Sequence, residues 1–323
     1  MEFKKSAVNA KDFKMRFNNR TMAERIMRAY NIWPSFPSIS ISGRACALNC
    51  RHCNGVYLRF MEGYTEPDKF LSAAYRHMEK GAKGFLISGG CDRDGRMLNL
   101  PKFLPAIKEL HESGAIIKLH TGFADEALAA EIADSTDIAS MEAVGDDETI
   151  REIFHLNCGV KKYKETFRNL KKAGIKYIAP HIAAGLHYGR LKGEFRALQY
   201  LREINPSTIS IIVFSPTGGT ELENIPPPTA ETVKSVVSRA REIFPETHII
   251  LGALRPRSPT TGVNHDERVR MEIAALDGGI SGIEMPSSEF LREARRRGWR
   301  IRHVEAYGVL PIDYEERVKS FYE

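Results

Sequence analysis

Cysteine and tryptophan are scarce in this 323-residue chain, with five and two residues respectively. The sequence also has no apolar run long enough to cross a bilayer. Residues 1–17 carry charge but no apolar core followed by a small-residue cleavage site, which argues against a secretory signal. We therefore expect a cytoplasmic protein without membrane segments. Thiols stay reduced in that compartment, so an odd, clustered set of cysteines indicates metal binding or catalysis rather than disulfides.

The composition is that of a soluble globular protein, with 42% hydrophobic and 27% charged residues. The net charge of +6 comes from 47 Lys and Arg against 41 Asp and Glu, and part of the excess lies in residues 292–303, REARRRGWRIRH. Such a stripe can attract an acidic protein or nucleic acid, although a solvated helix end also explains it. Exposed aromatic residues do not interleave with the basic ones, so a nucleic-acid-binding protein with a structural metal site is the alternative that we disfavour.

Short β-rich segments alternate with helical patterns along most of the chain, which is typical of a parallel sheet with crossover helices. Within residues 101–114, for example, Phe103, Ile107 and Leu110 share one face and Gly114 marks the end. The predicted strands number eight and cover residues 38–42, 84–88, 115–120, 137–142, 176–182, 208–215, 247–253 and 280–285. This pattern predicts an α/β fold, a (β/α)8 TIM-type barrel that is full or slightly open, although a six-unit partial barrel or a doubly wound sheet would give similar local patterns.

Three regions follow from this pattern. We expect an N-terminal helical extension over residues 1–35, with its helix at about 9–31, then the barrel over 36–298 and a C-terminal tail over 299–323. A barrel of this kind carries its active site at the C-terminal ends of its strands. Three of the five cysteines directly follow the first predicted strand, where such a fold places its chemistry.

Cys46, Cys50 and Cys53 have the spacing C-x3-C-x2-C. Three thiolates can hold three irons of a [4Fe-4S] cluster, and the absence of a nearby fourth cysteine leaves one iron open to another ligand. Structural zinc sites usually take four Cys or His ligands as two close pairs. The sequence offers no second C-x2-C and no H-x3-H pair, so the spacing favours the iron-sulfur cluster over zinc.

The segment CALNCRHC, residues 46–53, resembles the signature of the radical S-adenosylmethionine superfamily, including His52 one place before the third cysteine. The resemblance implies that Cys46, Cys50 and Cys53 hold a catalytic [4Fe-4S] cluster whose open iron binds S-adenosylmethionine. It also implies that the cluster, reduced by an electron donor such as ferredoxin, cleaves S-adenosylmethionine to a 5'-deoxyadenosyl radical. That radical abstracts hydrogen from an unactivated carbon.

The segment GFLISGGCD, residues 84–92, resembles the turn with which the family holds the methionine amino group. Gly89 and Gly90 match that turn, whereas Cys91 stands where the family has an acidic residue. A tight turn after a strand also explains the two glycines, and a buried inert thiol would explain Cys91.

Residues 38–300 resemble the biotin synthase branch of the superfamily, which implies further cofactor and substrate contacts at the strand ends. Except for Lys161 and Gly185, a core or loop-capping role explains each of these residues equally well. The implied residues are Glu142, Lys161, His181, Gly185, Ser215, Thr217, Arg255 and Arg257.

The chain lacks the strand cysteines that hold the second cluster of biotin synthase, and it lacks the N-terminal cysteine cluster of the usual bacterial lipoyl synthase. The two remaining cysteines, Cys91 and Cys158, are too few for an auxiliary cluster without help from other side chains or a partner protein.

The sequence looks most like the archaeal-type biotin synthase homologues, among them the two-protein lipoyl synthases that insert sulfur into an octanoyl chain on a carrier protein. This resemblance implies an acyl- or lipoyl-carrier protein and a second radical S-adenosylmethionine subunit as partners, with residues 292–303 as a docking surface. The alternative is a mutase or a metallocofactor-maturation enzyme, which needs only one cluster.

Overall fold

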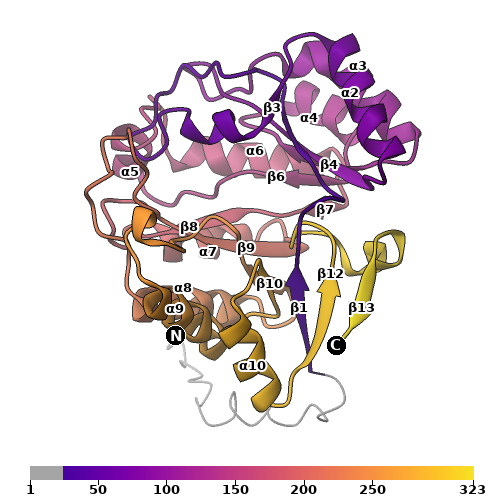
Figure 1. Cartoon of the computed structure of the whole chain (residues 1–323). Helices are drawn as coiled ribbons and strands as arrows, with labels where there is room; N and C mark the ends of the chain where they lie inside the picture. Colours follow the sequence, from indigo (N-terminus) through magenta and orange to yellow (C-terminus); the bar gives the residue numbers. More distant parts are fainter. Residues whose placement is uncertain (1–24) are drawn as a thin grey trace, which may run out of the picture.

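The computed structural model describes residues 25–323, and the chain forms two sheets flanked by helices (Figure 1). In the first sheet the strand order is β3 (Glu62–Gly63), β2 (Ser38–Ser40), β4 (Gly84–Ser88), β5 (Ile116–His120), β6 (Ile138–Ser140) and β7 (Tyr177–Ile178). In the second it is β13 (Ser320–Tyr322), β12 (Arg300–Val304), β1 (Ile26–Tyr30), β11 (Gly282–Glu284), β10 (His248–Leu251), β9 (Thr208–Val213) and β8 (His181–Ala184). Neighbouring strands are parallel except the pair β12 and β13.

The two sheets meet at β7 and β8, which are two parts of the single strand predicted over residues 176–182. The Ala179 N–H donates to the Ala139 carbonyl at 2.9 Å on one side, and the Ser210 N–H donates to the Pro180 carbonyl at 3.0 Å on the other. Each of the eight predicted strand segments contains a strand. Hydrogen bonding among the described residues does not close the barrel, because β11 pairs with β1 and not with β2.

Helices connect the strands and cover one face of each sheet (Figure 1). The α-helices are α2 (Pro67–Glu79), α3 (Leu100–Glu112), α4 (Glu126–Ala133), α5 (Asp147–Glu152), α6 (Val160–Lys172), α7 (Glu194–Leu201), α8 (Ala230–Ile243), α9 (His265–Gly278) and α10 (Ser288–Arg296), and the short 3-10 helices are η2 (Val56–Phe60), η3 (Pro259–Thr261) and η4 (Ile312–Arg317). On α3 the buried residues include the predicted stripe of Phe103, Ile107 and Leu110. Within residues 25–323, no helix has the length and apolar character that a membrane span requires.

Alternation along the strands separates two environments. Residues such as Ile87, Ile117 and Leu119 belong to the large apolar core that includes the helices. Their strand neighbours point the other way, into the space that the two sheets enclose. Several of these inward residues are polar, although branched apolar side chains usually dominate that space in a TIM barrel. They include Ser40, Ser88, Lys118, His120, Ser140, His181 and Ser210.

The predicted N-terminal helix at about 9–31 is not confirmed. Most of it lies outside the described residues, and its last part, Ile26–Tyr30, is strand β1. Met27 and Tyr30 are fully buried there because β1 lies between β11 and β12. Pairing with strands from the far end of the sequence therefore overrides the local helical pattern.

The expected C-terminal tail is also an integral part of the fold. After β12 it forms η4 and β13, and its side chains reach the first residues of β5, β6 and β7. The Tyr314 hydroxyl donates to Asp137 at 2.9 Å, and Arg317 donates to the Gly114 carbonyl at 3.1 Å. Residues 304–318 therefore cover one end of the enclosed space.

Glu315 provides a test of this packing. Its side chain is 3% exposed and pairs with Arg28 on β1 and Arg302 on β12. Removing the charge from one member of a buried pair leaves the other charges uncompensated, so Glu315→Gln should lower the free energy of unfolding by about 3 kcal/mol in urea titrations. The matched control is Glu316→Gln, because Glu316 is 90% exposed and also pairs with Arg302; it should change stability by less than about 0.5 kcal/mol. Equal effects of the two substitutions would contradict this account.

Candidate functional site

The cysteine-bearing loop follows β2 and is held from two sides by backbone hydrogen bonds. The Ala47 N–H donates to the Cys91 carbonyl at 2.7 Å, in the turn after β4. On the other side, the Arg51 N–H donates to the Ile153 carbonyl at 2.9 Å, just after α5. The loop is thus bonded both to the turn after β4 and to the end of α5, which are distant from each other in the sequence.

The three thiols of this loop differ in exposure: Cys50 is buried, while Cys46 and Cys53 are half-buried. Burial, together with the neighbouring thiols, raises the pKa of Cys50 above its ordinary value. A single tetrahedral zinc ion holds its sulfur ligands about 3.8 Å apart. Cys46, Cys50 and Cys53 do not form a group whose sulfur atoms all lie within 4.8 Å of one another. In this structure they are therefore not grouped as the ligands of one zinc ion would be.

Gly90 lies against this loop so closely that no side chain fits there. A Cβ at this position would be 2.0 Å from the Ala45 carbonyl oxygen and 2.5 Å from the Cys46 Cβ. The Gly90 N–H donates to the Ser42 hydroxyl at 2.7 Å, and that hydroxyl donates to the Ala45 carbonyl at 2.9 Å. Gly89 is less restricted, since its Cβ would meet only side-chain atoms at 3.3 Å or more. The predicted glycine pair therefore includes one residue required for docking of the loop.

Cys91 is brought together with the three motif cysteines. Its backbone N–H donates to the Cys46 Sγ at 3.4 Å, and its own thiol is half-buried. Burial raises the pKa of the Cys91 thiol, and the nearby Cys46 and Glu142 raise it further. A thiol therefore lies beside the loop, where the resemblance implied an acidic side chain.

His52 points into the protein, away from solvent. Its ring makes an edge-to-face contact with Phe154 at a centroid distance of 5.3 Å, and its Nδ1 atom is buried without a hydrogen-bond partner. Burial lowers the pKa of His52 to about 4, so the ring is neutral at physiological pH.

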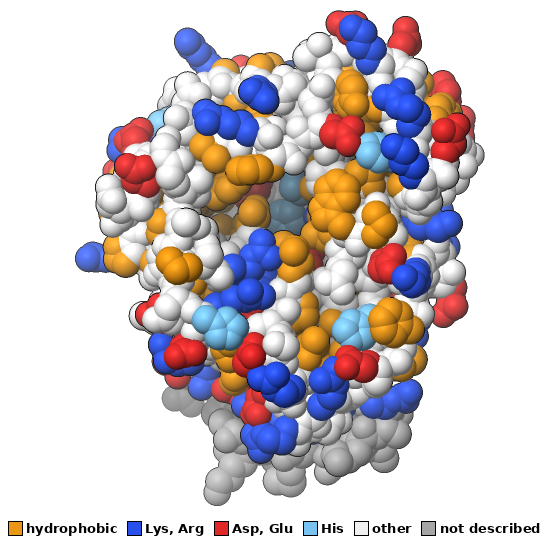
Figure 2. All heavy atoms as spheres, viewed as in Figure 1, with side chains coloured by type: hydrophobic (Ala, Val, Ile, Leu, Met, Phe, Trp, Pro, Cys, Tyr) orange, Lys and Arg blue, Asp and Glu red, His pale blue; other side chains and the backbone are white. Residues whose placement is uncertain are grey.

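A cleft of about 620 Å³ opens beside the loop, between the ends of β9 and β10. It is lined by Tyr57 from η2, by Ser215 and Thr217 after β9, and by Arg255 and Arg257 after β10. Tyr57 and Thr217 are joined by a 3.0 Å hydrogen bond, and the buried Ser215 hydroxyl has no partner. Figure 2 shows a hollow on this face of the molecule, with apolar side chains around it and Lys or Arg side chains on its rim.

The two arginines of the cleft differ in their bonding. Arg255 is fully buried, pairs with Glu272 at 2.7 Å and donates to the Gly252 and Glu284 carbonyls. It therefore braces the cleft wall with its two terminal nitrogens, while its Nε atom is buried without a partner. No carboxylate pairs with Arg257 among residues 25–323, so its guanidinium group is available at the cleft.

Glu142 and His181 lie side by side where the two sheets meet, as an isolated β-bridge between them shows. Burial raises the pKa of Glu142 and lowers that of His181. The His181 ring contacts His120 on β5 edge-to-face, with the centroids 5.1 Å apart. The inward residues Lys118, His120 and Ser140 were not selected from the sequence. The sequence feature that could have identified them is the lysine and the histidine within the otherwise apolar strand IIKLH.

Three predicted residues lie apart from these groups. The Lys161 side chain is 88% exposed on α6 and pairs with Glu165. The Gly185 N–H donates to Glu194 at 2.8 Å, and Pro228 fills the space beside its Cα. Cys158 is half-buried before α6. Lys161 in particular has no geometry suited to holding a cofactor beside the cysteine loop.

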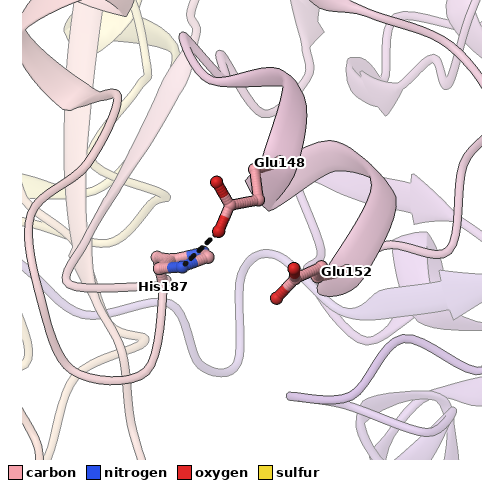
Figure 3. A group of neighbouring side chains, drawn as sticks. All are labelled: Glu148, Glu152 and His187. Carbon is pink, nitrogen blue, oxygen red and sulfur yellow. Dashed lines mark ion pairs between the residues drawn. The ribbon is translucent and has the colours of Figure 1, made fainter.

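A separate group of potential metal ligands comprises Glu148 and Glu152 on α5 and His187 after β8 (Figure 3). Glu148 lies 3.7 Å from His187 and 2.5 Å from the Lys192 ammonium. Lys192 also lies 3.3 Å from the His187 Nε2 atom. Because an ammonium group already supplies positive charge here, we assign no metal to this group.

The basic stretch 292–303 is not an uncompensated positive surface. Carboxylates of α9, α10 and the C-terminal residues neutralise most of it. The paired residues are Arg292, Arg295, Arg296, Arg297 and Arg302.

No family model and no curated protein matches the chain. Solved structures do resemble it. HydG, a maturase of the [FeFe]-hydrogenase, has a TM-score of 0.61 at 15% identity, over 90% of this chain and 67% of HydG. Methylornithine synthase (PylB) has a TM-score of 0.53 at 15% identity, over 85% of this chain and 81% of that protein. SuiB of Streptococcus suis bound to S-adenosylmethionine has a TM-score of 0.52 at 12% identity, over 78% of this chain and 58% of SuiB.

At these identities the likeness shows the fold alone. These neighbours do not confirm the biotin synthase branch that the sequence suggested, and it stays a prediction. The chain spans less than two thirds of the length of SuiB.

The close approach of Gly90 to the cysteine loop is testable without any cofactor. Gly90→Ala places a methyl group against backbone atoms, and overpacking of this kind costs about 1–3 kcal/mol. We expect reduced stability in urea and faster alkylation of Cys46, measured by mass spectrometry. Gly89→Ala is the matched control, because only side chains must adjust, and it should leave the alkylation rate near that of the wild type. Unchanged Cys46 reactivity in Gly90→Ala would show that this contact does not hold the loop.

Proposed function

We propose that this protein is a radical S-adenosylmethionine enzyme in which Cys46, Cys50 and Cys53 hold a [4Fe-4S] cluster. The observation that carries the proposal is the position of the three thiols. They lie on one loop at the end of a parallel strand, held against Gly90 and beside a cleft of about 620 Å³. The chain has the fold in which such enzymes are built.

When bound, the cluster and S-adenosylmethionine supply a 5'-deoxyadenosyl radical that removes hydrogen from an unactivated carbon. The chain's own residues position these groups and exclude water. Gly90 and the Cys91 backbone hold the loop, and the carbonyl oxygens of the Gly89–Gly90 turn are suited to accept hydrogen bonds from the methionine amine. Ser215, whose hydroxyl has no partner, Thr217 and Tyr57 offer hydrogen bonds along the cleft.

The first test uses Cys50→Ala. After anaerobic reconstitution with iron and sulfide and reduction by dithionite, the wild type should convert S-adenosylmethionine to 5'-deoxyadenosine, as measured by chromatography. Cys50→Ala should lose this activity because one iron loses its thiolate. Cys158→Ala is the control, since Cys158 lies apart from the other four cysteines, and it should retain the activity. Deoxyadenosine formation by Cys50→Ala at the wild-type rate would overturn the proposal.

The first candidate reaction is sulfur insertion into an octanoyl chain on a carrier protein. Its structural support is the apolar wall of the cleft, which includes Val56, Phe60, Pro216 and Leu254 and which suits an alkyl chain. Two observations weigh against it. The basic stretch 292–303 is largely neutralised, and Cys91 lies beside the motif cysteines rather than at a second cluster site.

The second candidate is a carbon-skeleton rearrangement or a metallocofactor-maturation reaction, which requires a single cluster. Its support is the polar lining of the enclosed space, where Lys118, His120, Ser140 and His181 suit a polar substrate better than an alkyl chain. HydG is described as a maturase and PylB as a synthase of methylornithine, which is in keeping with this class of reaction.

Iron and acid-labile sulfide per chain separate the two candidates. Sulfur insertion with an auxiliary cluster requires the content of two clusters, whereas the second candidate requires that of one. In parallel, the reduced protein and a second radical S-adenosylmethionine subunit are incubated with an octanoylated carrier domain, and lipoyl groups are sought by mass spectrometry. Lipoyl formation would establish the first candidate. One cluster per chain, with deoxyadenosine formed and no sulfur in the carrier, would reject it.

A further inference from the structure

The enclosed space between the sheets contains a group of polar side chains that the cysteine loop does not use. Lys118 and His120 project inward from β5, and Ser140 lies opposite His120 in the register of β5 and β6. His181 on β8 contacts the His120 ring. The His120 Nδ1 atom lies 3.3 Å from the Ser88 hydroxyl. This group therefore comes from strands β4, β5, β6 and β8, at the junction of the two sheets.

Several polar atoms in this group have no protein partner. The His120 Nε2 atom and the Ser140 hydroxyl are buried without hydrogen bonds. Lys118 is 4% exposed, and its ammonium group makes no hydrogen bond or ion pair with any residue from 25 to 323. Its nearest described contact is the face of the Tyr307 ring, 4.6 Å from Nζ. A buried ammonium group without a hydrogen-bonding partner is costly, and proteins rarely keep one without a reason.

Two carboxylates lie near Lys118, but neither bonds to its ammonium group. Glu284 raises the pKa of Lys118 by its charge, while its two carboxylate oxygens accept from the Ala253 and Gly308 N–H groups, each at 2.6 Å. Glu142 also raises the pKa of Lys118, although no hydrogen bond or ion pair joins the two, and burial raises the pKa of Glu142 itself. The imidazoles of His120 and His181 have lowered pKa values and are neutral. Burial lowers the pKa of Lys118 to about 8, so most of it still carries a proton at pH 7.

We infer that this interior site binds a small molecule through a carboxylate group that accepts hydrogen bonds from the Lys118 ammonium. The Ser140 hydroxyl is a second donor for the same ligand, and the His120 Nε2 atom is a further polar contact. A ligand carboxylate would supply the direct acceptor that Lys118 lacks, and hydrogen bonds between charged partners are stronger than neutral ones. The site rests on the proposed function in one respect, because it identifies the substrate class of the second candidate. An octanoyl amide has no carboxylate to offer.

The experiment uses acetate as the probe and the wild-type protein without cluster or S-adenosylmethionine. Lysine labelled with ¹³C at Cε reports the ionisation of Lys118 by nuclear magnetic resonance, and the signal is assigned from its absence in Lys118→Met. Acetate stabilises the charged amine, so saturating acetate should raise the pKa of Lys118 from its lowered value, while chloride at the same ionic strength should not. Acetate binding should weaken as the pH rises through the pKa of Lys118, because the ammonium loses its proton.

Variants supply a second readout that does not depend on the lysine signal. The affinity for acetate is measured from the broadening of the [¹³C]acetate resonance. The wild type and Lys118→Arg, which keeps a cation, should bind acetate with similar affinity. Lys118→Met should bind it about tenfold more weakly. Lys161→Met, at an exposed position, should behave as the wild type. If Lys118→Met does not fold, the wild-type titration still decides the matter, with the signal assigned from Lys118→Arg.

A Lys118 signal that does not respond to acetate, or acetate binding that is equal in Lys118→Met, would overturn the inference. That result would leave the radical S-adenosylmethionine proposal untouched, because no cluster is present in the experiment. Conversely, deoxyadenosine formation that survives Cys50→Ala would overturn the proposed function without affecting acetate binding at Lys118.

Discussion

Every strand of a parallel sheet has two faces, and in this protein helices cover only one of them. The apolar residues on that face, such as Ile87, Ile117 and Leu119, pack against the helices and supply most of the core. The opposite face must be filled from within the space enclosed by the two sheets. Part of it is filled by the C-terminal segment around Tyr307 and Tyr314, and another part carries Lys118, His120 and His181. Successive side chains of a strand point to opposite faces of the sheet. One face therefore supplies the apolar core, and the other presents the polar residues of the enclosed space.

The cysteine loop depends on a second kind of constraint, the close approach of backbone to backbone. Gly90 permits that approach, and the hydrogen bonds of Ala47 and Arg51 fix the loop between two distant parts of the chain. The positions of the thiols are therefore set by the surrounding scaffold rather than by the loop sequence alone. The same contact places Cys91 next to Cys46.

The sequence allowed prediction of all eight strand segments and of the cysteine motif, because both depend on local patterns. Strand β1 was not predicted, since the residues that make it a strand, in β11 and β12, lie near the other end of the chain. The sequence predicts a C-terminal tail for the same reason: the contacts of this segment with Asp137 and Gly114 are not encoded nearby. Family resemblance implies a cofactor contact at Lys161, but its side chain points to solvent. A role for Lys118 is not predictable from the sequence, because a single lysine in an apolar strand becomes meaningful only when its neighbours are known.

The position of β1 has a consequence for how the chain folds during synthesis. The strands β2, β4, β5 and β6 can pair as they are made, because each neighbour follows soon after the last. Strand β1 precedes these strands in the sequence, yet both of its partners, β11 and β12, follow β10. Its buried residues, including Met27 and Tyr30, must remain unpaired until those two strands have been made. Completion of the second sheet is therefore a late event in the folding of this protein.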